Sequence, residues 1–218
     1  MRRDSLAPIV ERKQARVASH ASFRELVGEP DWRRLPHAVR ARFGRELAPG
    51  ETIAFVGAVA ETRMTAVGWL WAQAARLVGA PLPLTRLSRT PAAVVVSQDA
   101  SADTQCWTRI YHENGRLPQV IRSTKRFAGP TGLEECVDAG IGMALDVTVE
   151  RRTLVFRSRE YFWRCGRLRL RIPYWLTPGR IDVLHREERA GRFSFTLVVT
   201  HPWFGESIRQ VAFFRDTQ

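Results

Sequence analysis

The sequence contains few cysteines, and none of them lie close together. Cys106, Cys136 and Cys165 are about thirty residues apart, and no C-x-x-C pair occurs. Zinc sites and disulfide frameworks use more closely organised cysteines, so this spacing argues against both. It is typical of reduced thiols in a cytosol, and we therefore expect a cytoplasmic protein.

Long hydrophobic runs are also absent. The longest apolar stretch, residues 66–72, is far shorter than the roughly 20 residues that a membrane-spanning helix needs. Charged residues interrupt the apolar residues that follow Met1-Arg2-Arg3, so no secretory signal is predicted. These two absences predict a soluble protein that is not integral to a membrane.

Common catalytic motifs are missing as well. The sequence has no G-x-S-x-G, H-E-x-x-H, Walker or G-x-G-x-x-G motif. Its five histidines are scattered, without the spacing of metal ligands. We expect no metal site and no cofactor. The missing motifs disfavour an enzyme, although they leave the question open.

Lysine is nearly absent, so arginine supplies almost all of the net charge of +12. The excess lies in residues 1–48, which carry +5, and in residues 151–192, which carry +8. Residues 1–20 have few large apolar side chains and are predicted to form a flexible basic arm. Residues 21–218 are predicted to form one β-rich domain.

Two short helices are predicted near the start of this domain. Ser22 and Glu25 have the spacing of a capping box, and Gly28 followed by Pro30 is expected to end that helix. The second helix follows from apolar residues at four-residue spacing, with a proline at a permitted first-turn position. Those apolar residues are Leu35, Val39 and Phe43.

A third helix is predicted from Ala66 to Val78. At about 100° per residue, Trp69, Gln73 and Arg76 share one side, and a stripe of apolar residues lies opposite. We expect that stripe to be buried. It consists of Val67, Leu70, Trp71, Ala74, Leu77 and Val78.

Nearly everything after Pro91 alternates with the period of β-strands. Asn114-Gly115 predicts a hairpin turn that places Trp107 opposite Arg122. In residues 141–149 apolar side chains alternate strictly with small or polar ones, which predicts one buried face and a second face that is either solvated or lines another feature of the fold. We expect an α+β, mostly β fold: an antiparallel meander of nine or ten strands forming a curved sheet or barrel, with two or three short helices.

Three residues of one predicted strand point to the same face. They are Trp107, Arg109 and Tyr111. An inward-facing arginine needs a carboxylate, which Glu134 or Glu135 would supply. This group would hold a carboxylate, phosphate or hydroxyl of a ligand inside the barrel. The alternative is a purely structural ion pair surrounded by aromatic side chains.

Two further residues complete the predicted ligand site of Trp107, Arg109, Tyr111, Glu135, Met143 and Trp203. Met143 lies on the alternating strand, and Trp203 lies in a loop whose aromatic side chains are expected at a pocket mouth. We predict that the protein binds a small amphipathic or hydrophobic molecule. Arg109 with Glu135 as an acid–base pair keeps an enzyme among the alternatives.

Seven short motifs occur in a characteristic order, and together they resemble a bacterial family, the domain of unknown function numbered 4166. The resemblance covers residues 23–215 and implies an accessory or ligand-handling module. Some members are fused to a nucleotide-binding reductase-like domain, which this sequence lacks. The motifs are Leu35-Pro36 with Val39-Arg40, Gly79-Ala80-Pro81-Leu82-Pro83, Trp107-x-Arg109 with Tyr111, Leu133-Glu134-Glu135, Leu176 with Pro178, Gly191-x-Phe193-x-Phe195, and His201-Pro202-x-Phe204-Gly205.

Other partners are consistent with the sequence. The helix bearing Trp69, or the arginines from Arg167 to Arg171, would dock on a partner oxidoreductase. The same arginines would contact an anionic membrane surface or nucleic acid. No nucleic-acid-binding motif accompanies the charge, and the solvent face of a sheet is normally charged, so nucleic acid is disfavoured.

Overall fold

The computed structural model of the chain describes residues 22–77, 79, 82–83, 86–99, 104–112, 115, 117–137, 139–166, 168–189 and 191–216. The predicted basic arm, residues 1–20, lies outside them. None of the helices in these ranges is long and apolar enough to cross a bilayer.

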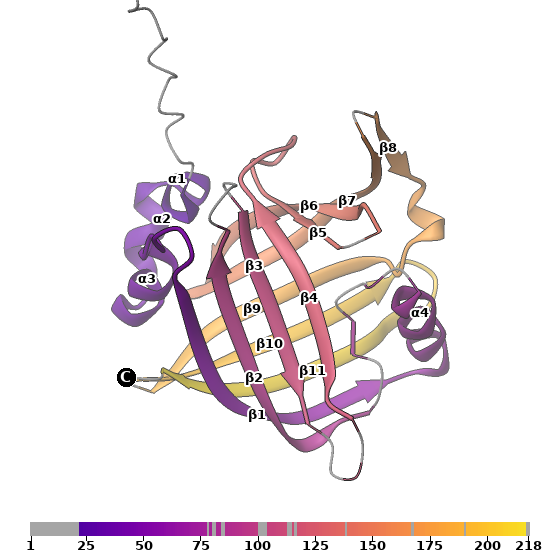
Figure 1. Cartoon of the computed structure of the whole chain (residues 1–218), viewed down its shortest axis with the longest axis horizontal. Helices are drawn as coiled ribbons and strands as arrows, with labels where there is room; N and C mark the ends of the chain where they lie inside the picture. The colour runs from indigo at the N-terminus through magenta and orange to yellow at the C-terminus, as the bar shows by residue number, and fades with distance from the viewer. Residues whose placement is uncertain are drawn as a thin grey trace, which may run out of the picture.

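Ten antiparallel strands form a closed barrel, so the predicted meander is confirmed (Figure 1). Neighbours in the barrel are also neighbours in sequence, apart from the pair β7 and β9 and the pair β1 and β11. Among the described residues an eleventh strand, β8, pairs with β7 and lies outside the barrel. The strands are β1 (Thr52–Met64), β2 (Ser88–Gln98), β3 (Thr104–Tyr111), β4 (Gln119–Arg126), β5 (Glu134–Cys136), β6 (Ile141–Glu150), β7 (Thr153–Cys165), β8 (Leu168–Ile172), β9 (Arg180–Arg189), β10 (Arg192–His201) and β11 (Gly205–Asp216).

Strand β6 departs from the pattern of one buried and one solvated face. Met143, Leu145 and Val147 are buried as expected, but Gly142 and Ala144 on the other side are buried too. A Cβ atom on Gly142 would lie 2.5 Å from the Phe162 ring, which therefore covers this part of the outer wall. Gly142 is therefore buried although it faces outward, because a side chain of the neighbouring strand β7 covers it.

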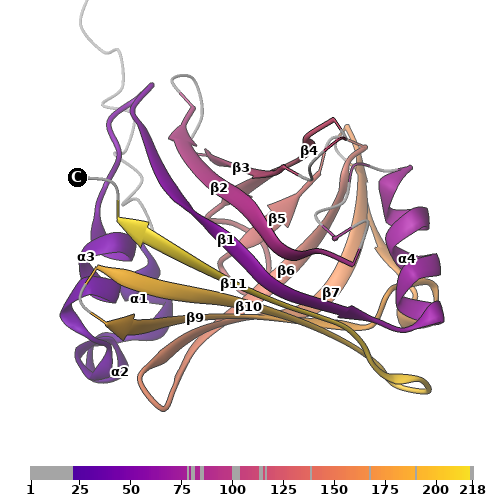
Figure 2. The same cartoon turned by 90° about the horizontal axis from the view of Figure 1, so that it is seen from below.

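Three helices close one end of the barrel: α1 (Phe23–Val27), α2 (Glu29–Arg34) and α3 (His37–Gly44) (Figures 1 and 2). The predicted capping box is present, because the Glu25 amide donates to Ser22 Oγ and the Ser22 amide donates to the Glu25 carboxylate. Helix α2 was not predicted. Pro30 follows the end of α1, as predicted, but it also lies in the first turn of α2. Its missing N–H removes no helical hydrogen bond there.

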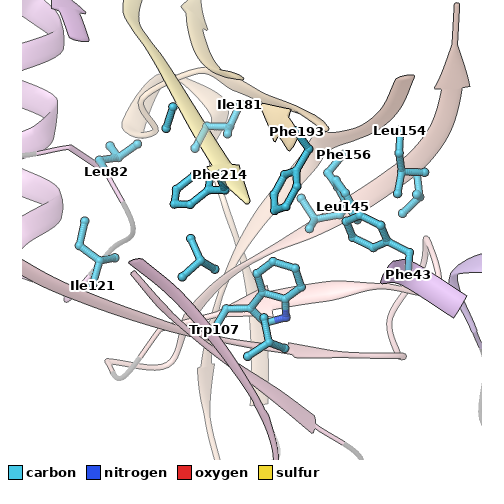
Figure 3. Close-up of a cluster of buried hydrophobic side chains, with 14 of the residues drawn as sticks. Phe43, Leu82, Trp107, Ile121, Leu145, Leu154, Phe156, Ile181, Phe193 and Phe214 are labelled. Atoms are coloured by element: carbon cyan, nitrogen blue, oxygen red, sulfur yellow. The ribbon is translucent and has the colours of Figure 1, made fainter. Parts of the chain in front are cut away.

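Aromatic side chains fill the closed end. The Phe43 ring of α3 lies 6.4 Å from the Trp107 ring of β3, 5.6 Å from Phe156 of β7 and 5.4 Å from Phe23 of α1. Figure 3 shows Phe43 reaching from its helix toward side chains of the barrel walls, including Leu145 and Phe156. This cluster joins the helices to the core of the barrel.

Buried charges also anchor α3. Arg42 donates to Glu187 Oε2 at 2.7 Å and to both carboxylate oxygens of Asp216 at 2.7 and 2.9 Å. Its guanidinium lies 4.0 Å from the centroid of the Phe193 ring. The helix is thereby tied to β9, β10 and β11.

Helix α4 (Ala66–Arg76) lies at the opposite end (Figures 1 and 2). The predicted buried stripe is wrong, because Leu70 and Leu77 are exposed and Gly68 and Ala72 are buried instead. A Cβ atom on Gly68 would lie 2.2 Å from the carbonyl oxygen of Ser207. The helix therefore contacts the start of β11 through its smallest residues, which leaves Trp69 and Leu70 exposed and Trp71 half-buried.

Candidate functional site

A cavity of about 80 Å³ lies inside the barrel. A second cavity of about 240 Å³ adjoins it at the α4 end, and Glu135, Met143 and Ile181 line both. The inner cavity is lined by Val94, Trp107, Arg109, Tyr111, Lys125, Glu135, Met143, Leu145, Phe156, Ile181, Val183, Phe195, Leu197, Gln210, Ala212 and Phe214. The outer cavity is bounded by Trp71, Ala74 and Ala75 of α4, by Leu82, and by Leu176, Thr177 and Pro178 around the short 3₁₀ helix η1 (Tyr174–Leu176).

A cluster of charged side chains faces the inner cavity from β3, β4 and β5. Arg109 donates to Ser123 Oγ at 3.1 Å and to Glu135 Oε1 at 3.2 Å. Lys125 Nζ lies 2.9 Å from the other carboxylate oxygen of Glu135, and Ser123 donates to Oε1 at 2.6 Å. One carboxylate is thus shared by two cations and a hydroxyl.

The register of the strands produces this cluster. Trp107 pairs with Ser123, and Lys125 pairs with Glu135. Because paired residues of neighbouring strands share a face, all four side chains point into the barrel. Arg109 lies two residues after Trp107 and therefore points the same way.

Among the described residues the cations in this cluster outnumber the carboxylates, because Arg109 and Lys125 both pair with Glu135. Burial lowers the pKa of Lys125 to about 8; Glu135 opposes this shift and Arg109 adds to it. Burial by itself would raise the pKa of Glu135, but Lys125 and Arg109 outweigh that effect and hold this pKa well below its usual range. At neutral pH the cluster therefore carries a net positive charge inside the barrel.

A second polar group links β3 to β11 and β1. Tyr111 donates to Gln210 Oε1 at 3.4 Å, and Gln210 donates in turn to Thr62 Oγ1 at 3.0 Å. Burial raises the pKa of Tyr111, so its hydroxyl stays protonated at neutral pH. Apart from these polar groups the inner cavity has an apolar lining, and its electrostatic character is set by Arg109 and Lys125.

Five of the six predicted site residues line this cavity: Trp107, Arg109, Tyr111, Glu135 and Met143. The predicted carboxylate partner of Arg109 is present, and it is Glu135. Glu134 points to the outer wall, where it pairs with Arg126 and Arg164.

The structure does not bring Trp203 to the cavity. It lies in the turn between β10 and β11 with 73% of its surface exposed, and its backbone N–H donates to His201 Nδ1. His201 is buried and packs between this turn and Trp71 of α4, so the turn contacts the rim and Trp203 points outward.

Sequence reasoning missed Lys125, because the predicted hairpin register was wrong by one residue. Trp107 lies opposite Ser123 rather than Arg122. A shift of one residue exchanges the two faces of a strand, so the expected register would place Lys125 on the outside. The alternation of Ile121, Ser123 and Lys125 with exposed Val120 and Arg122 is the pattern that places it correctly.

The described residues contain no group of three or more histidine, cysteine, aspartate or glutamate side chains that is arranged to hold a metal ion. The cluster at the cavity is instead suited to an anion, since Arg109 and Lys125 are hydrogen-bond donors only.

Comparison with known proteins adds a family. The family model described as a domain of unknown function, DUF4166, matches residues 35–214. No curated protein and no solved structure matches the chain. The matched segment begins just before α3, spans the whole barrel and ends within β11. The chain therefore belongs to the DUF4166 family.

Proposed function

We propose that the barrel binds a small amphipathic molecule, with an anionic head group, such as a carboxylate, at Arg109 and Lys125. The apolar part of the molecule lies in the inner cavity and extends toward α4. The observation that carries this proposal is the excess of cations over carboxylates among the described residues at an otherwise apolar cavity, with Lys125 buried and Arg109 half-buried.

Buried charges favour such a ligand for two reasons. A charge removed from water is stable only when it is paired and hydrogen-bonded, and in the part of the chain that the structure describes Arg109 and Lys125 share one carboxylate. Arginine has five N–H donors and lysine has three, which is more than Glu135 and Ser123 accept. A ligand carboxylate would balance the charge and accept the remaining hydrogen bonds.

The size of the cavities restricts the ligand. Drug-sized ligands occupy pockets of about 300–1,000 Å³, so the inner cavity of about 80 Å³ holds only the head group and its nearest atoms. The adjoining cavity of about 240 Å³ would take a short acyl chain or a small ring. Entry is at the α4 end, because the aromatic cluster around Phe43 closes the other end.

Calorimetric titration with octanoate and with 1-octanol tests the proposal. The two probes have the same chain and differ in head-group charge, so we expect octanoate to bind more tightly. Lys125→Met keeps an unbranched side chain, shorter by its terminal ammonium group, and removes its charge. We expect this variant to bind octanoate about tenfold more weakly and to bind octanol unchanged. Equal binding of the two probes by the native protein, or no binding of either, would contradict the proposal.

The pH dependence provides a second test. The pKa of Lys125 is lowered to about 8, so its amine loses its proton as the pH rises from 7 to above that value. The charged form attracts the carboxylate, and affinity for octanoate should therefore fall over this range while affinity for octanol stays constant. An octanoate affinity that does not change between pH 7 and pH 9.5 would show that Lys125 does not hold the head group.

A further inference from the structure

Exposed hydrophobic side chains gather at the α4 end of the barrel. Among the described residues, eleven of the fourteen large hydrophobic side chains that are exposed belong to three regions. These regions are α4 with its C-cap, the segment from β7 to η1, and the turn between β10 and β11, and Figures 1 and 2 show all three at the same end. The eleven residues are Trp69, Leu70, Leu77, Trp163, Leu168, Leu170, Tyr174, Trp175, Leu176, Trp203 and Phe204.

The β7–β8 hairpin has one apolar and one basic face. Trp163 pairs with Leu170 on one face, and Arg164 pairs with Arg169 on the other. The hairpin extends beyond the barrel, where β8 has no second neighbouring strand (Figure 1). Its apolar face is therefore exposed although it is composed like the core of a sheet.

This apolar face continues the inner wall of the barrel. Tyr161 and Ile172 pair across the base of the hairpin, and both line the outer cavity. Because alternate residues of a strand share a face, Trp163 and Leu170 extend the same surface outward. The exposed hydrophobic side chains thus surround the mouth of the cavity and are continuous with its lining.

Positive charge accompanies these side chains. Residues 161–180 contain five arginines and no acidic residue. Arg164 and Arg169 pair with Glu134 and Glu160, and Arg180 pairs with Asp182. Arg171, in contrast, reaches Glu160 only at 3.9 Å and has a side chain that is 75% exposed, so it carries available positive charge. A partner for this end must offer apolar contact and negative charge together.

We propose that this end of the barrel, with the mouth of the cavity, docks on the surface of an anionic phospholipid bilayer. Tryptophan and tyrosine side chains favour the boundary between head groups and acyl chains, and leucines can enter it. Arginines beside them are attracted to anionic head groups. The apolar groups stand on three separate elements around an opening, which suits a deformable lipid surface. Docking would connect the cavity with the apolar layer of the membrane.

Sedimentation of the full chain with lipid vesicles tests this proposal. One set of vesicles contains phosphatidylcholine alone, and the other contains equal parts of phosphatidylcholine and phosphatidylglycerol. We expect binding to the second set and little binding to the first. No sedimentation with either set, or equal sedimentation with both, overturns the proposal. If neither set of vesicles binds the protein, the surface belongs to a protein partner instead.

Paired variants separate the apolar contribution from general effects of substitution. Trp175→Ser, at the mouth, should lower the fraction bound to anionic vesicles. Val56→Ser, on β1, changes a comparably exposed residue away from the mouth and should leave the bound fraction unchanged. Equal effects of the two substitutions overturn the assignment of the docking surface.

Charge reversals give a matched pair as well. The side chains of Arg171 and Arg33 are 75% and 73% exposed, and they lie at opposite ends of the barrel. Arg171→Glu should weaken binding to anionic vesicles by about tenfold or more, because each basic residue near such a surface contributes separately. Arg33→Glu should have little effect. A similar loss in both variants would indicate attraction by net charge alone and overturn the proposal.

Discussion

The two ends of the barrel are closed by helices in different ways. At the α1–α3 end, Phe23 and Phe43 enter the barrel and pack against aromatic side chains of its walls. At the α4 end, Gly68 and Ala72 face β11, and no aromatic residue of the helix is buried. Large inward side chains fill one end, whereas small ones leave a cavity open at the other.

This difference separates stability from binding. The closed end holds the helices to the strands with aromatic contacts and the buried Arg42 ion pairs. The open end presents apolar and basic side chains to the outside around the mouth of the cavity. We therefore expect substitutions to lower the free energy of unfolding at the closed end, and to change binding more than stability at the open end.

The largest effect is expected at Phe43. Its ring contacts Phe23, Trp107 and Phe156, so Phe43→Ala leaves a cavity between helix and barrel. The free energy of unfolding in urea should fall by about 3–5 kcal/mol. Trp69→Ala, at the exposed face of α4, should change it by no more than about 0.5 kcal/mol. A comparable loss in both variants would remove the distinction between the two ends.

A smaller loss is expected in the middle of the barrel. Glu135→Gln keeps the shape of the side chain but removes the counter-charge of the buried Lys125 and the half-buried Arg109. Breaking a buried pair in this way should cost about 3 kcal/mol at neutral pH, and less at a pH above the pKa of Lys125. Urea unfolding at pH 7 and at pH 9.5 measures both values. A loss that is equal at the two pH values would contradict the charge explanation.

A moderate effect is expected where α4 meets the barrel. In the Gly68→Ala variant the added Cβ atom would lie 2.2 Å from the backbone oxygen of Ser207, so the helix must move away from β11. We expect a loss of about 1–3 kcal/mol, as for other overpacked sites. Ala74→Ser, on an exposed position of the same helix, should cost about 0.5 kcal/mol or less. Equal stabilities of the two variants would show that the close approach is unimportant.

The smallest effect on stability is expected at Leu70, and Leu35 serves as its comparison. Leu70 and Leu35 are leucines on helices at opposite ends, with 60% and 3% of their surfaces exposed. Leu70→Ser should leave the melting temperature nearly unchanged, whereas Leu35→Ser should lower it clearly. A marked decrease for the first variant would mean that the α4 end is covered in solution by another part of the chain.

Local patterns in the sequence predicted much of this structure. The capping box of Ser22 and Glu25, the inward direction of Trp107, Arg109 and Tyr111, and the burial of Met143 follow from spacing alone. Each depends on residues within a few positions of one another. Alternation over many short strands likewise predicted a meander that curves into a barrel.

Other features depended on distant parts of the chain. Trp71 and Leu70 belong to one apolar stripe of α4, but the contact with Ser207 selects Gly68 as the buried position. The hairpin between β3 and β4 has a register one residue away from that expected for an Asn114-Gly115 turn, and Asn114 itself lies outside the described residues. Because of that single shift the sequence did not predict Lys125 at the site, and the proposed binding of an anion depends most on this residue.

The pairing of β1 with β11 has a consequence for synthesis of the chain. All other strand pairs of the barrel join elements that are close in sequence, whereas this pair joins residues 55–64 to residues 208–216. During translation β1 therefore keeps an unpaired edge until β11 leaves the ribosome. Unpaired edges of this kind recruit other strands, so the growing chain is most exposed to aggregation until β11 has been made.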